Sequence, residues 1–171
     1  MVSTIESVCG EIHNFFETSK EIGDYTIDGG GLSLPFLSVG QFFRIIGSKF
    51  NDGVYIYSDE YLIRDASWDD ILNDYPNWMS VADKEWGELK HTELIDESFH
   101  GAICPMAIPR AFLELTKEID EYIGSDASKA SPYVSENIGG HYSYTKAKPS
   151  DNAWQNVFSA KLKRWRKVPN I

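Results

Sequence analysis

The stretch Gln41–Ser58, QFFRIIGSKFNDGVYIYS, decides the fold class of this chain. It holds two runs rich in β-branched and aromatic residues, Gln41–Gly47 and Gly53–Tyr57, joined through the turn sequence NDG. Such runs around an Asp-Gly turn are typical of a β-hairpin. Just upstream, YTIDGGGLSLPFL (25–37) alternates around a glycine-rich turn, so we expect a meander or a small barrel. Its strands are predicted at Tyr25–Ile27, Leu32–Phe36, Phe42–Ile46 and Val54–Tyr57.

Helical patterns flank this β-rich region. The first, residues 3–20, spaces its apolar residues three or four apart, as one face of an amphipathic helix does. Ser3 and Glu6 match a capping box at its start. A second helix is predicted to begin near Pro109 and to end at Gly124. A third is AWQNVFSAKLKRWRKV, residues 153–168. The three apolar stripes are Ile5, Val8, Ile12, Phe15 and Phe16; Phe112, Leu115, Ile119, Tyr122 and Ile123; and Trp154, Val157, Phe158, Leu162 and Trp165.

The remaining segments complete an α+β prediction. Residues 58–93 are acidic and weakly periodic, which indicates a polar excursion with one or two short helices. A short strand is expected at Gly101–Cys104, and residues 125–152 form a long loop, which is uncommon unless it has a function. The predicted fold is a small helical bundle of N-terminal, central and C-terminal helices, with a β-rich insertion between the first two. Residues 1–23 and 101–171 would form the helical core with a C-terminal arm, and residues 24–100 the insertion.

Composition favours one folded unit. The chain has 171 residues, of which 42% are hydrophobic and 25% charged, within the ordinary globular range. Its two cysteines, Cys9 and Cys104, lack metal-ligand spacing, so we expect buried thiols in a reducing compartment. No apolar run approaches the roughly 20 residues that cross a bilayer. The N-terminus MVSTIESVCG lacks the order of a signal peptide, so the protein is expected to be cytosolic where it is made.

The formal charge of −10 is unevenly distributed. Residues 146–171 carry seven basic residues against one acid, a net charge of +6, which leaves −16 for residues 1–145. A basic arm on an acidic body suits an acidic protein surface. An alternative is a solubilising surface with a cationic helix end that matches the helix dipole. Nucleic-acid binding through KLKRWRK (161–167) is a further alternative, but the acidic body opposes it, so protein binding is favoured.

Motifs of catalysis are weak in this sequence. The four histidines share no motif with a nucleophile or a second ligand. The pairs Asp69–Asp70 and Asp96–Glu97 could bind a divalent cation or act as acid and base, but adjacent surface acids are common. Gly139–Gly140 does not stand at a strand-to-helix junction of a phosphate loop. We therefore expect no catalytic residue, no metal and no cofactor.

The C-terminal half carries a family resemblance. Residues 106–120 (MAIPRAFLELTKEID), 131–146 (SPYVSENIGGHYSYTK) and 154–168 (WQNVFSAKLKRWRKV) occur in an order that resembles the head–tail connector (adaptor) proteins of long-tailed double-stranded DNA phages. In that family a helix precedes a Ser-Glu-x-Ile-Gly-(Gly/Asp)-Tyr-Ser segment, and a closing helix ends in a Tyr/Trp-Arg-Lys-like stretch. The matching residues are Ser135, Glu136, Ile138, Gly139, Gly140, Tyr142 and Ser143, then Leu162, Trp165, Arg166 and Lys167.

Two features depart from the family pattern. His141 stands between Gly140 and Tyr142, which lengthens the glycine segment. Residues 24–100 interrupt helices that are often close together in the family. Within that insertion, VGQFFRIIGSKFNDGVYIY (39–57) is similar to a segment of connector-like proteins from phages and prophages of Gram-positive bacteria.

The resemblance implies an assembly component of the virion neck, present in the host cytoplasm during assembly. Connectors form a homo-oligomeric ring, expected to be a dodecamer, that docks on the portal protein and receives a stopper or tail-completion protein. Double-stranded DNA would pass through without specific binding, and no membrane is involved. The residues expected at the portal or at the neighbouring protomer are Ser135, Glu136, Gly139, Gly140, Tyr142, Tyr144, Lys161, Lys163, Arg164, Trp165, Arg166 and Lys167.

Two other functions stay open at this point. One is a β-domain binding or recognition module of the phage tail, and the other is a small hydrolase that uses the Asp69–Asp70 region. The ligand face of the recognition module would consist of Tyr55, Tyr57, Trp68, Trp78 and Trp86.

Overall fold

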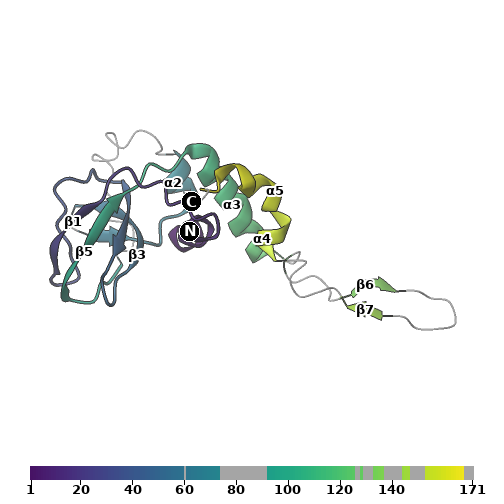
Figure 1. The fold of residues 1–171 in the computed structure, drawn as a ribbon, viewed down its shortest axis with the longest axis horizontal. Helices are drawn as coiled ribbons and strands as arrows, with labels where there is room; N and C mark the ends of the chain where they lie inside the picture. The colour runs from purple at the N-terminus through teal and green to yellow at the C-terminus, as the bar shows by residue number, and fades with distance from the viewer. Residues whose placement is uncertain are drawn as a thin grey trace.

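The computed structural model describes residues 1–59, 61–73, 92–125, 128, 133–136, 144–146 and 153–167. The fold is α+β: an N-terminal helix is followed by a five-stranded antiparallel sheet and then by further helices. Figure 1 shows the sheet at one end of the long axis, with the helices beside it. The described helices are few and do not form a clear bundle.

The sheet confirms the hairpin predicted over residues 41–58. β2 pairs with β3 in antiparallel register, so that Phe42 faces Ile56 and Phe43 faces Tyr55. The strand order is β1-β5-β2-β3-β4, which places β5, the last of the five in sequence, between β1 and β2. The five strands are β1 (Glu21–Ile27), β2 (Phe42–Ile46), β3 (Gly53–Ser58), β4 (Tyr61–Ile63) and β5 (Glu97–Pro105).

One predicted strand is wrong. Residues 32–36 form no strand, although Leu32 and Leu34 are buried. A turn follows at Pro35, closed by a hydrogen bond from Leu37 N to the Leu34 carbonyl at 2.9 Å. Leu34 N donates to the Tyr57 hydroxyl at 3.2 Å instead of to a neighbouring strand. The two leucines are therefore buried because the loop packs against the sheet, not because the segment is a strand.

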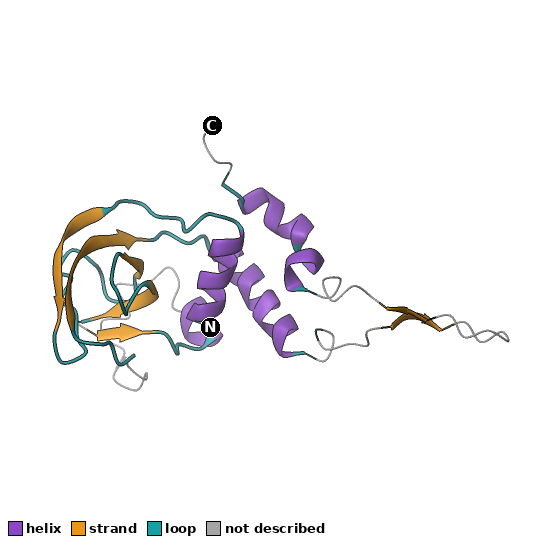
Figure 2. Cartoon of the chain, turned by 60° about the horizontal axis from the view of Figure 1, so that its bottom comes forward, coloured by secondary structure: helices purple, strands orange, loops and turns teal. Residues whose placement is uncertain are grey.

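Both faces of the sheet are covered by apolar side chains. Successive side chains of a strand point to opposite faces, so every residue of β3 is buried. On one side of the sheet, α1 (Val2–Glu11), α2 (Trp68–Asn73) and α3 (Arg110–Gly124) share a hydrophobic core with it, in which α1 lies against β3 and α3 packs on α1 and α2. Figure 2 shows helices beside the sheet. The other face packs against loop residues such as Leu34 and Leu94. The predicted border between residues 100 and 101 falls inside β5, which pairs with β1 on both sides of it. The sheet itself therefore crosses that border.

The N-terminal helix is shorter than predicted. α1 ends at Glu11, and the backbone then turns through His13 and Phe16, whose φ angles are 53° and 54°. Few side-chain-bearing residues adopt this left-handed region, so it stops the helix. The predicted capping box is also wrong, because Met1 is the N-cap and makes no side-chain capping bond. Glu6 instead forms an ion pair with Arg64.

The second predicted helix is confirmed in its bounds. Pro109 is the N-cap of α3, and Gly124 is its last helical residue. Phe112, Leu115 and Ile119 are buried as expected, whereas Ile123 is 43% exposed. The short helix expected within residues 58–93 is α2, and residues 74–91 lie outside the described part of the chain.

The C-terminal helix is broken into three pieces. These are α4 (Trp154–Val157), α5 (Ser159–Leu162) and the 3₁₀ turn η3 (Lys163–Trp165). The break falls at Phe158, whose ring packs edge-on against Tyr122 of α3 with a centroid distance of 5.7 Å. Docking on α3 thus replaces the single straight stripe that the sequence predicts.

A second, two-stranded sheet stands between α3 and α4 in the chain. β6 (Tyr133–Glu136) and β7 (Tyr144–Lys146) pair in antiparallel register, with Ser135 opposite Thr145 and Glu136 opposite Tyr144. Figure 1 places this hairpin at the end of the molecule farthest from the five-stranded sheet. The segment predicted as a long loop therefore contains a short β-hairpin.

Candidate interface

The C-terminal segment, residues 153–167, is held against the body by an aromatic cluster. The centroid of the Phe16 ring lies 4.7 Å from that of Phe112 and 5.9 Å from that of Trp165. The centroids of Phe112 and Trp165 are 5.5 Å apart. Leu162 is fully buried in the same core. Burial of this kind is the main stabilising term for such a short segment. The segment thus belongs to the folded body as far as Lys167.

Polar contacts join the same segment to residues 11–14. Asn14 Nδ2 donates to the Trp165 carbonyl at 3.0 Å, and Lys167 N donates to the Ile12 carbonyl at 3.2 Å. Arg166 forms an ion pair with Glu11 at 2.9 Å. The buried indole nitrogen of Trp165 has no hydrogen-bond partner among the described residues. Trp165, expected at an intermolecular interface, is half-buried and packs against the hydrophobic core of its own chain.

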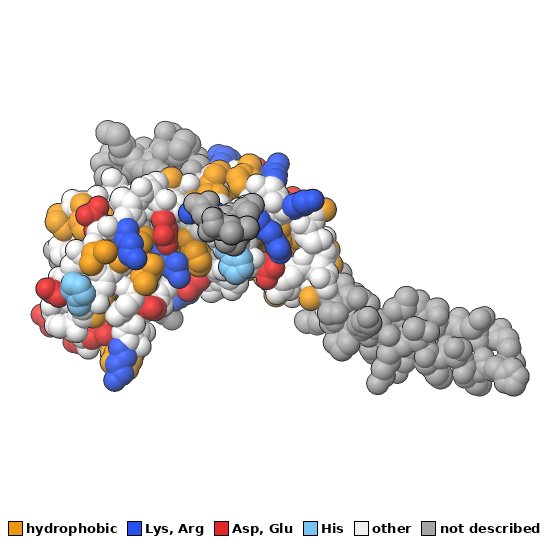
Figure 3. Space-filling model, in the orientation of Figure 1, with side chains coloured by type: hydrophobic (Ala, Val, Ile, Leu, Met, Phe, Trp, Pro, Cys, Tyr) orange, Lys and Arg blue, Asp and Glu red, His pale blue; other side chains and the backbone are white. Residues whose placement is uncertain are grey.

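The predicted cations divide into two groups. Lys161 pairs with Glu118 of α3, and Arg166 pairs with Glu11 of α1, so acids of the body neutralise both. Lys163, Arg164 and Lys167 are exposed, and no described acid pairs with them. Figure 3 shows Lys and Arg side chains over this helical part of the molecule. The outward-facing charge of this segment is therefore smaller than the sequence total indicates.

A groove of about 460 Å³ separates α3 from α5. Glu114 and Glu118 stand on the α3 side, and Lys161 and Arg164 on the α5 side. Ala111 and Ala160 also line it, and their small side chains leave the space between the helices open. Lys161 pairs with Glu118 across this groove, so part of its charge is already neutralised within the chain.

The predicted interface residues thus fall in two places. Ser135 and Glu136 lie on β6, and Tyr144 lies on β7. The cations lie on the C-terminal segment, beside α3. Gly139, Gly140 and Tyr142 lie outside the described residues.

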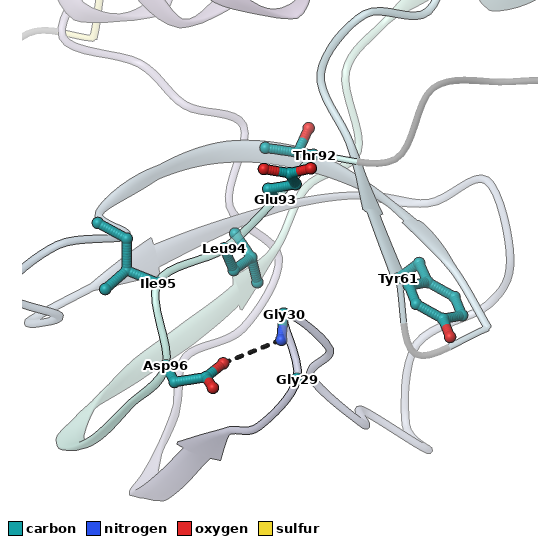
Figure 4. Close-up of a pocket in the computed structure, with 8 residues that line it drawn as sticks. All are labelled: Gly29, Gly30, Tyr61, Thr92, Glu93, Leu94, Ile95 and Asp96. Atoms are coloured by element: carbon teal, nitrogen blue, oxygen red, sulfur yellow. Dashed lines mark hydrogen bonds between the residues drawn. The ribbon is translucent and has the colours of Figure 1, made fainter.

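A second hollow, of about 620 Å³, lies beside the turn that follows β1 (Figure 4). Its lining contains the acids Glu93 and Asp96, but they do not act as a pair. Asp96 turns toward the turn and accepts a hydrogen bond from Gly30 N at 2.9 Å. The hollow is lined by Gly29, Gly30, Tyr61, Thr92, Glu93, Leu94, Ile95 and Asp96.

The paired acids of the sequence serve separate structural partners. Asp70 accepts a hydrogen bond from Ser67 N at 3.1 Å at the start of α2, whereas Asp69 lies 4.0 Å from Lys117. Asp96 holds the glycine turn, and Glu97 holds the loop between β2 and β3. Neither pair presents two carboxylates to a shared space, as a paired acid and base or a shared divalent cation would need.

The other candidate side chains also occupy structural positions. Cys9 and Cys104 are buried free thiols, as expected, and burial raises the pKa of Cys9 to about 12. An inert thiol follows, since the thiolate is the reactive form. His100 lies 2.8 Å from Asp24 on the surface, while His91 and His141 lie outside the described residues. Among the described residues no three His, Cys, Asp or Glu gather as metal ligands would, and no described helix is long and apolar enough to cross a membrane.

The aromatic ligand face expected for a recognition module is wrong in three positions. Tyr55 and Tyr57 are buried on the loop-covered face of the sheet. Trp68 is buried in the helix-facing core, where its Nε1 donates to Asp120 at 2.9 Å. The sequence pattern did not show that both faces of this sheet are covered, so aromatic residues expected on an exposed face are buried instead. Trp78 and Trp86 lie outside the described residues.

Sequence reasoning missed the role of Glu97. Its carboxylate accepts hydrogen bonds from the Ser48 hydroxyl, from Asn51 Nδ2 at 2.6 Å and from Lys49 N at 3.2 Å. These contacts fasten the β2–β3 loop to the start of β5. No local sequence pattern predicts these hydrogen bonds, because the partners are more than 40 residues apart in sequence.

This arrangement makes the stability of the protein depend on pH. The hydrogen bond from Ser48, followed by those from Asn51 and the loop backbone, holds the pKa of Glu97 below its ordinary value of 4.5. A lowered folded-state pKa stabilises the fold above the unfolded value, and this stabilisation is lost as the pH falls through the folded-state pKa. We therefore expect the Glu97 contribution to disappear as the pH is lowered from 4.5.

Urea unfolding measures this contribution. It is carried out on the wild-type protein, Glu97→Gln and Ser48→Ala between pH 3 and pH 7, a range of about four units that includes the ordinary carboxyl pKa. The stability difference between wild type and Glu97→Gln should shrink as the pH falls. Ser48→Ala keeps the carboxylate but loses its main donor, so its difference should shrink less. A difference that is constant over the range would contradict the assigned role.

Comparison with protein-family models, with curated proteins and with solved structures found no match to this chain.

Proposed function

We propose that this chain is a head–tail connector (adaptor) of a long-tailed double-stranded DNA phage or prophage of a Gram-positive bacterium. One observation carries the proposal. The segment with the connector motif, within residues 131–146, contains the β6–β7 hairpin, which stands in the chain between α3 and the basic C-terminal segment. An element that leaves the folded body suits assembly with another chain better than it suits catalysis.

In this proposal α1, α3 and the C-terminal helices form the connector core, and most of the five-stranded sheet is the inserted part. Copies of the chain form a ring, expected to be a dodecamer, on the portal protein. The ring joins the DNA-filled head to the stopper or tail-completion protein in the virion neck, after synthesis in the host cytoplasm. Double-stranded DNA crosses the ring without specific binding, because an acidic body repels phosphates.

The exposed cations supply the portal-facing charge. Lys163 and Lys167 project from the C-terminal segment, where no described acid neutralises them. An acidic or polar portal rim would attract them over about 10 Å at ordinary ionic strength. Truncation of residues 146–171 is a poor test of this role, because it would also remove Phe158 and Leu162 from the core. Reversal of the exposed charges keeps those contacts.

The double variant Lys163→Glu and Lys167→Glu is expected to weaken binding to the portal of the same phage by about tenfold or more. The cause is lost attraction at the rim of the interface, which chiefly slows association. Surface plasmon resonance on immobilised portal, at two salt concentrations, measures it. The weakening should be smaller at high salt, where surface charges are screened.

The matched control is Lys20→Glu with Lys49→Glu, which changes the net charge equally at two exposed positions of the β-rich part. It should bind the portal as the wild-type protein does. Equal loss in both double variants would indicate that net charge alone matters. If the wild-type chain forms no ring with the portal in electron micrographs, the connector proposal itself is wrong.

A further inference from the structure

Two β-elements at opposite ends of the molecule (Figure 1) have edges with no partner strand among the described residues. β1 is the end strand of the five-stranded sheet, and no described strand pairs with its outer side. β6 and β7 pair with each other and with no other described strand. Figure 1 shows the two edges at the two ends of the long axis. The hairpin of one molecule therefore does not reach its own β1.

The outer edge of β1 has few of the features that protect edge strands. It is seven residues long and mostly exposed, contains no proline or lysine, and pairs with β5 in continuous register. The Tyr25 hydroxyl donates to the Glu21 carbonyl of the same strand at 2.8 Å. Ile22 is 66% exposed, more than any other large hydrophobic side chain of the described residues. A long exposed edge of this kind pairs readily with a strand of another chain.

The hairpin needs a partner for a different reason. An isolated two-stranded hairpin is only marginally stable in water, because it lacks a third strand or a helix to pack against. In its second strand and just beyond it, the sequence YTKAK (144–148) carries two lysines and no acid. The β1 edge carries two acids, Glu21 and Asp24, and the Asp24 side chain is 92% exposed. The sequence YTKAK is thus opposite in charge to the two acids of β1.

We infer that the β6–β7 hairpin of one copy adds to the β1 edge of the next copy and extends its sheet. The contact joins two different surfaces, so it is heterologous and repeats from copy to copy. Such a contact closes into a ring when the rotation per copy permits, and otherwise gives a filament. The inference rests on the proposed connector function and identifies which surfaces of the ring meet.

Two variants, each defective in one edge, test the inference. Ile22→Lys places a cation on the β1 edge, where it removes the exposed apolar contact and repels the lysines of the hairpin segment. In the second variant a Gly/Ser linker of equal length replaces residues 133–146. Each variant alone is expected to lose self-association by about tenfold or more and to sediment as a monomer where the wild-type protein is oligomeric.

Mixing the two variants gives the sharpest result. The Ile22→Lys chain keeps its hairpin, and the linker variant keeps its β1 edge, so the mixture should form a 1:1 complex that grows no further. Phe36→Lys is the matched control, because Phe36 is 48% exposed but lies outside β1. It should assemble as the wild-type protein does. Asp24→Lys, also on the edge, should reproduce the loss seen with Ile22→Lys.

Analytical ultracentrifugation reports every outcome. The inference is overturned if Ile22→Lys and Asp24→Lys assemble normally, if the mixture stays monomeric, or if the wild-type chain is monomeric up to millimolar concentration, roughly the local concentration that linked sites reach. A ring that the Ile22→Lys chain still forms on the portal would overturn this contact and leave the connector proposal standing. If wild-type oligomers depend on the β1 edge but fail to bind the portal, the contact stands and the connector proposal is overturned.

Discussion

Phe112→Ala is expected to lower the free energy of unfolding by about 3–5 kcal/mol. The Phe112 side chain is fully buried on α3, and its ring contacts both Phe16 and Trp165. Its removal leaves a cavity beneath the C-terminal segment, and the broken helices α4 and α5 cannot close it without losing their own contacts. Urea unfolding followed by circular dichroism measures the change, which is a large part of the stability of an ordinary domain.

The same variant should release the C-terminal segment before the sheet unfolds. Hydrogen exchange of residues 158–165 should become faster than that of β2 and β3, because the aromatic cluster is the main contact of that segment. Phe36→Ala is the control, since an exposed phenylalanine contributes roughly 0.5 kcal/mol or less. A loss below about 1 kcal/mol for Phe112→Ala would mean that the cluster does not hold the segment.

Gly101→Val is expected to cost up to about 3 kcal/mol, the upper range for overpacking a core. A Cβ atom at Gly101 would lie 2.4 Å from the Ile46 carbonyl oxygen and 2.9 Å from the Phe99 ring. The carbonyl belongs to the backbone of β2, so it cannot turn away as a side chain would. Relief requires β5 to separate from β2 at the centre of the sheet.

Gly10→Ala is the matched control for this substitution. Nothing lies within 4 Å of a Cβ at Gly10, and its position in α1 should make alanine stabilising by about 0.5–1 kcal/mol. Thermal unfolding of the two variants should therefore shift in opposite directions. A Gly101→Val protein as stable as wild type would contradict the close approach of β2 and β5.

Local signals predicted the elements whose partners are near in sequence. The hairpin of β2 and β3 follows from two β-rich runs and an Asp-Gly turn, so neighbouring residues contain all the information. The bounds of α3 follow from Pro109 and Gly124, since these residues act on the backbone at their own positions. Burial of Cys9 and Cys104 follows from their chemistry and from the absence of metal spacing.

Long-range contacts account for what was missed. Leu32 and Leu34 have the alternation of a strand, but Pro35 and a hydrogen bond to Tyr57 make them a buried loop. The C-terminal stripe breaks at Phe158 because that residue docks on Tyr122. Of the candidate interface, the sequence identified the cations but predicted the segment with β6 and β7 as a loop, and the partners Glu11 and Glu118 appear only in the structure.

The sequence by itself determined the α+β class, the central hairpin, α3 and the separation of basic and acidic charge, because each depends on residues close together in the chain. Only the tertiary structure decided that β5 lies between β1 and β2, that the C-terminal segment docks on the body, and that the β1 edge and the β6–β7 hairpin stand at opposite ends. These features depend on pairings between distant residues, where many arrangements satisfy the same local pattern and packing selects one.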